Sequence, residues 1–217
     1  DLISAGNAAA GHDVSVPGAA GEEGVTITTT NNAPTGLDFF GGSTALGFEW
    51  HSASDFMADG LKVSVSYSTD NGAAATATAA IQNHWGLGAT YVTDAGDTAL
   101  TLGAGVSGTD YSKTGTALTN DENGFHVGAS AVTGDLTVAA GFADGDDIVD
   151  KGTGNSANYQ VDAEVTKVGV KYVTGDITLN LGYASGEAKD STTAGTAGTT
   201  SDSKDVLGAS VSYAVAS

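Results

Sequence analysis

Apolar and polar residues alternate strictly in nine stretches of the chain, which is the pattern of β-strands with one apolar and one polar face. The stretches cover residues 44–51, 61–67, 84–92, 99–106, 124–132, 136–142, 166–173, 177–183 and 206–213. The apolar phase includes Leu102, Val127, Val138 and Leu179, and the alternate phase includes Thr101, Gly128, Thr137 and Thr178. A shift of one residue would exchange the two faces, so the register of each strand is strongly specified.

The connections between these stretches also alternate. The sequence VTGDLTVAAGF begins at Val132, and VTGDITLNLGY begins at Val173, 41 positions later. Short turns are predicted at 93–98, 133–135 and 174–176, and long connections at 68–83, 107–123, 143–165 and 184–205. Every acidic residue except Glu49 falls outside the predicted strands. This order predicts an up-and-down antiparallel sheet with the long acidic connections at one end.

Such a sheet covers a soluble core or closes into a barrel whose apolar face meets lipid, and alternation alone does not separate the two. Aromatic residues gather at strand ends, as in the interfacial girdles of membrane barrels; they are Trp85, Tyr91, Phe125, Phe142, Tyr172, Tyr183 and Tyr213. Strands of about seven to nine residues, tilted by roughly 40°, come close to the ~25 Å apolar band. The sequence therefore predicts an all-β, transmembrane, antiparallel up-and-down β-barrel.

Composition excludes several other classes of function. The 217 residues include 26 acidic side chains against seven lysines, with no arginine, for a formal net charge of −19. Nucleic-acid binding needs clustered basic residues, so no nucleic-acid partner is expected. Cysteine is absent, which excludes disulfides and thiolate chemistry. We find no phosphate-binding glycine loop and no nucleophile–base arrangement, so we expect no enzyme.

The hairpins GFHVGASAVTGDLTVAAGFADGD and VGVKYVTGDITLNLGYASGEA resemble the C-terminal half of a bacterial general porin of the alphaproteobacterial type. The resemblance covers about residues 44–217. It implies part of a 16-stranded barrel, roughly strands 7 to 15, in a homotrimer that contacts outer-membrane lipid and lipopolysaccharide. The implied function is a water-filled channel for passive diffusion of small hydrophilic solutes and ions. Nine strands do not close an even-numbered barrel, so we expect further strands at both ends.

Residues 1–43 contain no convincing strand except over 24–30, and we expect a long extracellular loop region before the barrel strands of 44–217. In the resemblance, a long loop at this place folds inward and narrows the pore; a solvated outer loop is the alternative. By that match the constriction acids are Asp13, Glu22, Glu23 and Asp38. The larger polar groups of the lumen-facing strand phase are Glu49, Lys62, Lys171 and Asn180.

Neither the histidines nor the acidic runs predict a resident metal ion. His84 and His126 are placed at matching strand ends about 10 Å apart, at ~4.8 Å per strand, which is too far for shared zinc ligation. The acidic run at 144–150 does not match the calcium-loop spacing, so a solvated charge run is favoured over loop-bound Ca²⁺ or divalent bridging to lipopolysaccharide. No other cofactor is expected. The alternative to a channel is a secreted or cell-surface β-rich structural protein, such as an adhesin.

Overall fold

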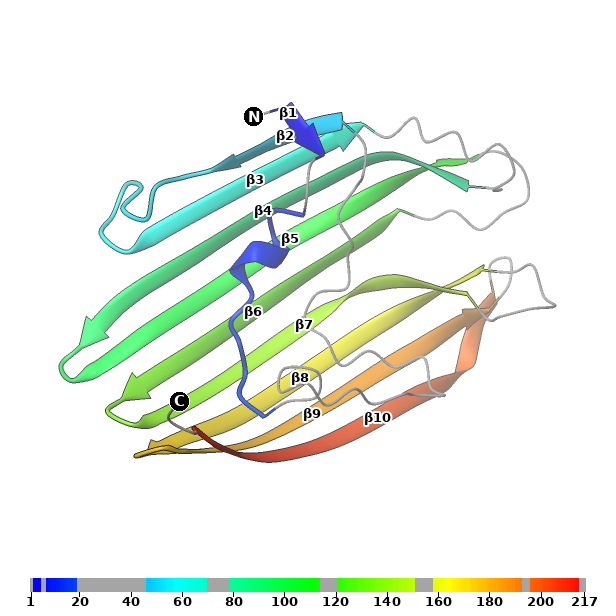
Figure 1. Cartoon of the computed structure of the whole chain (residues 1–217). Helices are drawn as coiled ribbons and strands as arrows, with labels where there is room; N and C mark the ends of the chain where they lie inside the picture. The colour runs from blue at the N-terminus through cyan, green and yellow to red at the C-terminus, as the bar shows by residue number, and fades with distance from the viewer. Residues whose placement is uncertain are drawn as a thin grey trace.

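The computed structural model is one antiparallel sheet in which each strand pairs with the next along the chain (Figure 1). It describes residues 2–4, 7–18, 46–69, 79–113, 121–150, 158–192 and 196–214. Its strands are β1 (Leu2–Ser4), β2 (Leu46–His51), β3 (Leu61–Thr69), β4 (Ala79–Ala95), β5 (Thr98–Lys113), β6 (Glu122–Thr133), β7 (Leu136–Asp150), β8 (Asn158–Thr174), β9 (Ile177–Thr192) and β10 (Thr196–Tyr213). The all-β, up-and-down fold predicted from the alternation is confirmed.

The nine predicted strands correspond to β2–β10, and β1 is an addition. It lies within residues 1–43, where we expected a loop, and pairs Leu2 with Phe48 and Ser4 with Leu46. Three residues are too few to show alternation, which explains why the sequence did not reveal this strand. The other candidate strand of that region, 24–30, lies outside the described residues.

The repeated Gly-Asp pairs form the short turns at one end of the sheet. Gly96, Gly134 and Gly175 have φ of 66°, 57° and 57°, and the aspartates that follow them do not have positive φ. A two-residue hairpin turn with positive φ at its first residue is the type II′ turn, which requires glycine there. The twist of this turn matches the twist of the flanking strands. The Gly-Asp pair therefore recurs in the sequence because each of these hairpins needs a glycine at the same position of its turn.

At the opposite end, the strands continue well beyond their predicted bounds. For example, β8 begins at Asn158 rather than near 166, and β10 begins at Thr196 rather than near 206. Acidic residues expected in connections therefore lie on strands, and ladder pairing sets Asp144 opposite Glu164, and Glu164 opposite Glu187. The acidic run at 144–150 is likewise part of β7 rather than a loop.

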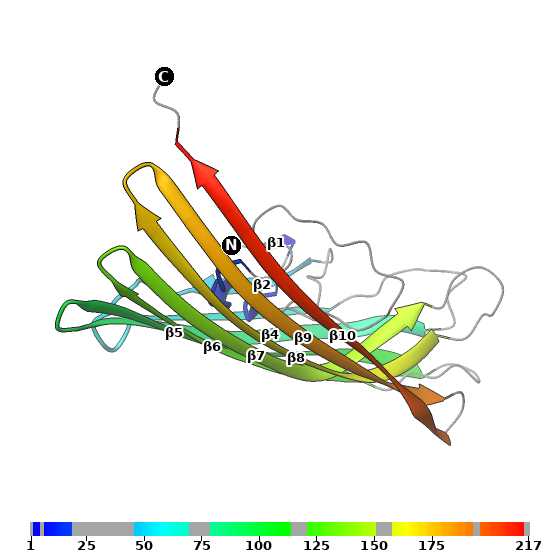
Figure 2. The ribbon, with the colours of Figure 1, turned by 90° about the horizontal axis from the view of Figure 1, so that it is seen from below.

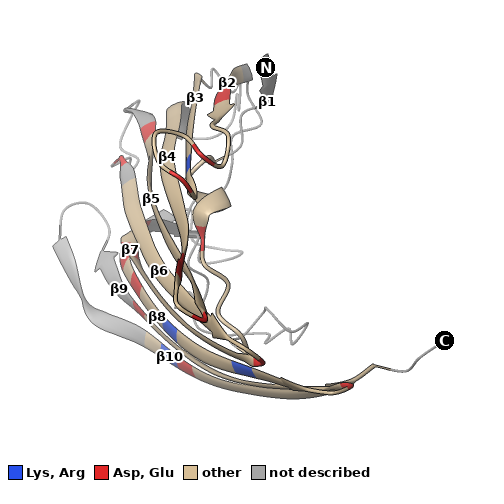
Figure 3. Cartoon of the chain, turned by 90° about the vertical axis from the view of Figure 1, so that its left-hand side faces the viewer, with Lys and Arg blue, Asp and Glu red and all other residues tan. Residues whose placement is uncertain are grey.

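The sheet bends into a trough with a convex and a concave face (Figures 2 and 3). The convex face carries the apolar phase, and its strand-centre residues Leu102, Val127, Val138 and Leu179 are 47%, 45%, 46% and 41% exposed. The concave face carries the polar phase and is largely covered; Ser64 and Ser66 are each 1% exposed. In the described sheet the apolar side chains thus lie on the exposed convex face, and the polar side chains lie on the covered concave face.

Aromatic side chains border the apolar part of the convex face at both strand ends. Tyr91, Tyr172 and Tyr213 lie near the short turns, while Tyr67 pairs with Trp85, and Phe125 lies 5.9 Å from Phe142 between ring centroids, towards the other end. Just beyond that second row the Tyr183 hydroxyl donates a 2.7 Å hydrogen bond to Asp205. The change from apolar to acidic residues at this row is what a membrane–water boundary requires.

In the described part of the chain no helix is long and apolar enough to cross a membrane. The helical element there is the 3₁₀ turn η1 (Ala10–His12), which lies on the concave side of the sheet (Figure 3).

Candidate functional site

Residues 7–18, here called the inner segment, cross the concave face transversely to the strands (Figure 1). Its contacts follow the strand order, from Asn7 over Gly86 of β4, through Val14 over Gly128 of β6 and Pro17 over Gly169 of β8, to Gly18 over Gly208 of β10. The segment therefore lies against most of the wall formed by β4–β10.

The wall beneath the inner segment is built from glycines that face one another across neighbouring strands. The pairs are Gly88–Gly105, Gly103–Gly128, Gly128–Gly141, Gly169–Gly182 and Gly182–Gly208, which we call the glycine row. Without a Cβ, these residues allow another backbone to approach closely. A Cβ on Gly169 would overlap the carbonyl oxygen of Pro17, and one on Gly103 that of His12. The glycine row thus provides the space that the inner segment fills.

The second half of the inner segment has a wall side and an open side. After the extended residue Asp13 (φ −61°, ψ 136°), the chain alternates so that Val14 and Val16 are buried while Asp13 and Ser15 are exposed. Val16 packs with Ala139 of β7. Burying a valine side chain contributes about 1.5–3 kcal/mol. Apolar contact therefore holds this half against the wall and leaves the Asp13 carboxylate on the side facing the trough.

The first half is held by hydrogen bonds to wall hydroxyls. The Ala8 amide donates a 3.0 Å hydrogen bond to the Ser66 hydroxyl, and the Asn7 side-chain amide donates a 3.4 Å bond to the Ser107 hydroxyl. The Asn7 side-chain oxygen also accepts a 3.0 Å bond from the Ala9 amide. The Ala8 bond satisfies a buried donor that would otherwise cost about 1–3 kcal/mol.

His12 is the most enclosed polar residue of the segment, at 2% exposure, and both ring nitrogens meet wall hydroxyls. Nδ1 lies 2.7 Å from the Thr90 hydroxyl, and Nε2 lies 2.8 Å from the Ser64 hydroxyl. Nδ1 of His51 lies 2.7 Å from the same Ser64 oxygen, and its Nε2 lies 3.0 Å from the Glu49 carboxylate. Because an ionised carboxylate only accepts, one consistent proton arrangement with both rings neutral runs from Thr90 through His12, Ser64 and His51 to Glu49.

The surroundings of His12 favour its neutral form. Burial is the largest cause of its lowered pKa, followed by the positive charge of Lys62 and by His126 and His51, while Asp13 acts in the opposite direction. Burial removes the water that would solvate an imidazolium. The neutral ring is therefore the form that fits between Ser64 and Thr90.

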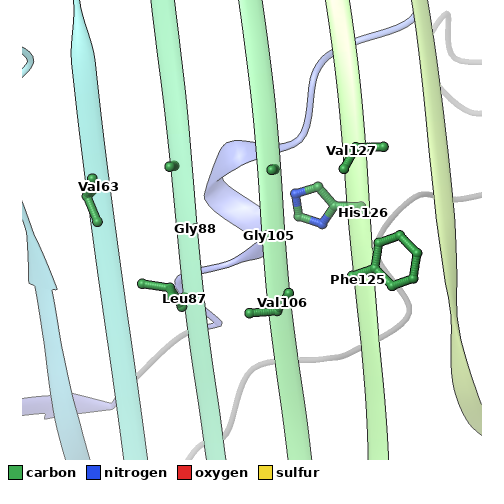
Figure 4. Close-up of a pocket in the computed structure, with 10 residues that line it drawn as sticks. Val63, Leu87, Gly88, Gly105, Val106, Phe125, His126 and Val127 are labelled. Carbon is green, nitrogen blue, oxygen red and sulfur yellow. The ribbon is translucent and has the colours of Figure 1, made fainter.

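Asp13 itself meets a second histidine of the wall. Nε2 of His126, on β6, lies 2.9 Å from Oδ1 of Asp13, with side-chain exposures of 6% and 28%. The His126 ring lies over Gly105, where a Cβ would overlap it (Figure 4). The pair thus joins a buried imidazole to a carboxylate that remains open to the trough.

The comparison with models of protein families matches residues 4–217 to the model described as Gram-negative porin. The chain belongs to the Gram-negative porin family. No curated protein and no solved structure matches this chain. Membership places the porin in the bacterial outer membrane and confirms the family that the two hairpins suggested. The family implies a channel rather than an enzyme, while the narrower alphaproteobacterial type stays a prediction.

The four predicted pore-lining residues of the porin share the concave phase of their strands. Lys62 is exposed there and Lys171 is partly exposed, whereas Glu49 is 13% exposed beside His51. Asn180 is only 6% exposed and donates a 3.0 Å hydrogen bond to the Ser210 hydroxyl. Lys62 and Lys171 are thus the members of this set that a solute in the trough would meet most directly.

Of the four predicted constriction acids, Asp13 lies in the inner segment, and Glu22, Glu23 and Asp38 lie outside the described residues. The residues that sequence reasoning missed are His12 and its partners Ser64 and Thr90. Ser64 and Thr90 are marked in the sequence only by the polar phase of their strands, and His12 lies outside any strand. His12 and Ser64 are 52 positions apart, and nothing local links them.

Among the described residues, no group of three or more histidine, aspartate or glutamate side chains is arranged to hold a metal ion. His84 and His126, weighed above as zinc ligands, have separate partners: His84 meets the Thr109 hydroxyl at 3.0 Å, and His126 meets Asp13. The porin wall also has an apolar groove of 370 Å³ on its convex face, around the small pair Ala89 and Ala104 (Figure 4). That groove faces away from the inner segment.

Proposed function

We propose that this porin forms a water-filled channel for passive diffusion of small hydrophilic solutes and ions. The observation that carries the proposal is the distribution of side chains over the curved sheet. Leu102, Val127 and Leu179 are more than two-fifths exposed on the convex face, while serines, threonines and glycines form the concave face. A water-soluble sheet would bury these apolar residues. A barrel wall between lipid and water needs this reversed arrangement.

We further propose that the inner segment narrows the channel. Three features support this role: it lies on the concave face, apolar contacts and hydrogen bonds hold it there, and it presents the Asp13 carboxylate to the trough. Glu22, Glu23 and Asp38 complete the proposed set of constriction acids. A solvated outer loop, the alternative for residues 1–43, does not account for the burial of Val14 and Val16 against the wall.

Lipid and lipopolysaccharide are the proposed surroundings, with the acidic extensions of β7–β10 at the headgroup level beyond the aromatic row. A homotrimer is the assembly that the family resemblance implies, and analytical ultracentrifugation in detergent tests it. Calcium bound at 144–150 is a weaker proposal, because this run is part of strand β7 rather than a ligand loop.

The channel proposal is tested by swelling of liposomes that contain the native protein. Sugars and amino acids below a size limit should enter and swell the vesicles, whereas larger oligosaccharides should not. Protein-free vesicles and vesicles with heat-denatured protein serve as controls. A surface-exposed structural protein or adhesin would give no swelling above these controls for any solute, which would reject the channel.

A further inference from the structure

We propose that His126 sets the charge that Asp13 presents to the lumen, and thereby makes the ion selectivity of the channel depend on pH. The inference rests on the proposed channel function and adds a residue that tunes its selectivity. His126 acts through Asp13, because at 5% exposure the ring does not itself meet the solution.

The geometry joins the two groups and leaves one of them open. Nε2 of His126 is 2.9 Å from Oδ1 of Asp13, and the Asp13 side chain is 28% exposed towards the trough. On the strands beside β6, the residues paired with His126 are Gly105 of β5 and Ala143 of β7. Neither carries a titratable group, so Asp13 is the charged partner in contact with this ring.

Among the described residues, the other titratable groups that interact with the inner segment here lie on that segment and on β2 and β3, and Lys167 of β8 is a further buried charged residue of the concave face. His12 lies near enough to affect His126 electrostatically, and Lys62 and His51 in turn act on His12. Glu49 lies beyond, in contact with His51. Because His12 has a lowered pKa, it favours the neutral form, and it does not compete for Asp13 at neutral pH.

The charge states follow from the chemistry of the pair. Histidine is the side chain whose charge ordinarily changes between pH 5 and pH 8. When the imidazole is neutral, Asp13 presents one negative charge to the lumen. The neutral ring already carries its proton on Nε2, beside the carboxylate; when the other ring nitrogen also takes up a proton, imidazolium and carboxylate form an ion pair with no net charge. Cation preference should therefore be higher at alkaline pH and fall as the solution is acidified.

A change of one unit charge at Asp13 should produce a measurable change in ion selectivity. A unit charge about 7 Å from a permeating ion, in water, changes the ion's energy by about one RT, and screening at about 0.1 M salt reduces this to about half of RT. The local concentration of a cation then rises, and that of an anion falls, by about 1.6-fold each, so their ratio changes by about two- to three-fold. Acidification from pH 8 to pH 5.5 should thus lower the cation-to-anion permeability ratio by about two- to three-fold through this pair. Other lumen groups, His51 and Glu49 among them, add their own pH dependence, so a comparison of variants is required.

The experiment measures reversal potentials across planar bilayers in a KCl gradient at pH 8 and pH 5.5. The native protein is compared with His126→Gln, whose amide keeps a donor for Asp13 but cannot take up a proton. The matched control is His84→Gln, since His84 is also a buried histidine of the concave face but contacts Thr109 rather than Asp13. Asp13→Asn removes the carboxylate itself.

Between pH 8 and pH 5.5 the cation-to-anion permeability ratio of the native protein should fall about two- to three-fold more than that of His126→Gln. His84→Gln should show the same fall as the native protein. Asp13→Asn should have the lower preference at both pH values and a smaller pH shift, because the buried ring loses the carboxylate that stabilises its charged form; this variant decides the matter if His126→Gln does not fold. A full native pH shift in His126→Gln or in Asp13→Asn overturns the proposal. Absence of any channel from the native protein rejects the proposed function instead.

Discussion

At the residue scale, His12 links the inner segment to three strands of the wall. It contacts Thr90 of β4 and Ser64 of β3 directly, and through Ser64 it reaches His51 of β2. Its neutral form fits this place because the ring is enclosed and lies near Lys62. The contact of the inner segment with the wall, here called its seating, is therefore linked to the protonation state of His12.

This linkage gives a pH dependence with a definite sign. The pKa of His12 is lowered from 6.5 when the segment is seated, so the released segment binds the proton more readily. The contact of the inner segment with the wall is strongest above pH 6.5. Its equilibrium constant falls by up to about tenfold per pH unit as the pH drops from 6.5 to the lowered pKa of His12. Hydrogen exchange of the amides at 8–14, corrected for intrinsic rates, should show faster exchange under acid. In His12→Gln the acid effect should be absent; its persistence there would assign the effect to another group.

Gly169 is a residue at which one added methyl group should displace the inner segment. Its Cβ would overlap the Pro17 carbonyl oxygen, and overpacking of this kind costs about 1–3 kcal/mol. The chain has no cysteine, so Val16→Cys can report on seating by its rate of maleimide labelling. Labelling should be slow in this background and faster with Gly169→Ala. Gly11→Ala is the control, since no atom lies within 4 Å of its added Cβ; equal rates in both variants would contradict the assigned contact.

At this scale, sequence reasoning could assign the face of each strand residue but not its partner. Alternation predicted that Leu102 and Thr101 point to opposite sides. The contact of His12 with Ser64 depends on the path of a non-repetitive segment across the sheet, and local periodicity contains no information about such a path. The glycine row was similarly hidden, because its members become neighbours only when the register of adjacent strands is known.

At the scale of elements, the Gly-Asp turns fix one end of the hairpins. Gly175 has φ 57° and open space around its Cβ position, so the cost of a side chain there is purely a backbone cost. Gly175→Val should destabilise the folded protein by about 1–2 kcal/mol. Gly175→Asn should cost less, since asparagine is among the residues that occur at the positive-φ positions of primed hairpin turns. Denaturant unfolding in detergent micelles measures both, and an equal loss for the two variants would argue against this explanation.

The strand ends at the opposite side show the limit of pattern analysis. Beyond the aromatic row, both faces of the strands carry polar or small residues, as at Asp162 to Glu164 of β8. Period-2 alternation of hydrophobicity disappears there although the backbone ladder continues, with Asp146 still paired to Asp162. The sequence therefore predicted the part of each strand that faces lipid and missed the part that extends into water.

The convex and concave phases of β7 should differ in how strongly an added charge destabilises the protein. Val138 lies at the strand centre on the convex face and is 46% exposed, while Thr137 belongs to the concave phase. Val138→Lys should cost about 2–4 kcal/mol in lipid vesicles, because it places an ammonium in hydrocarbon. Thr137→Lys should cost much less. The measurement is denaturant unfolding from vesicles, together with lipid-phase accessibility of spin labels at both sites; the reverse order would contradict the assignment of the faces.

At the scale of the whole molecule, the described strands form an open arc rather than a closed barrel. Strands β1 and β10 are its two edges and are not paired with each other. The curvature and the inner segment on the concave face (Figures 2 and 3) are features of a channel wall, as are the exposed apolar residues of the convex face. Closure into a 16-stranded barrel stays a prediction.

The most direct test of the account is single-channel recording of the native protein in planar bilayers, beside a variant in which residues 7–18 are replaced by a Gly-Ser linker of equal length. The linker preserves chain length but cannot make the contacts of Val16, His12 or Asp13 with the wall. We expect stepwise openings from the native protein and larger steps from the linker variant. Native protein without any openings would contradict the channel, and openings of equal size in the two proteins would contradict the constriction.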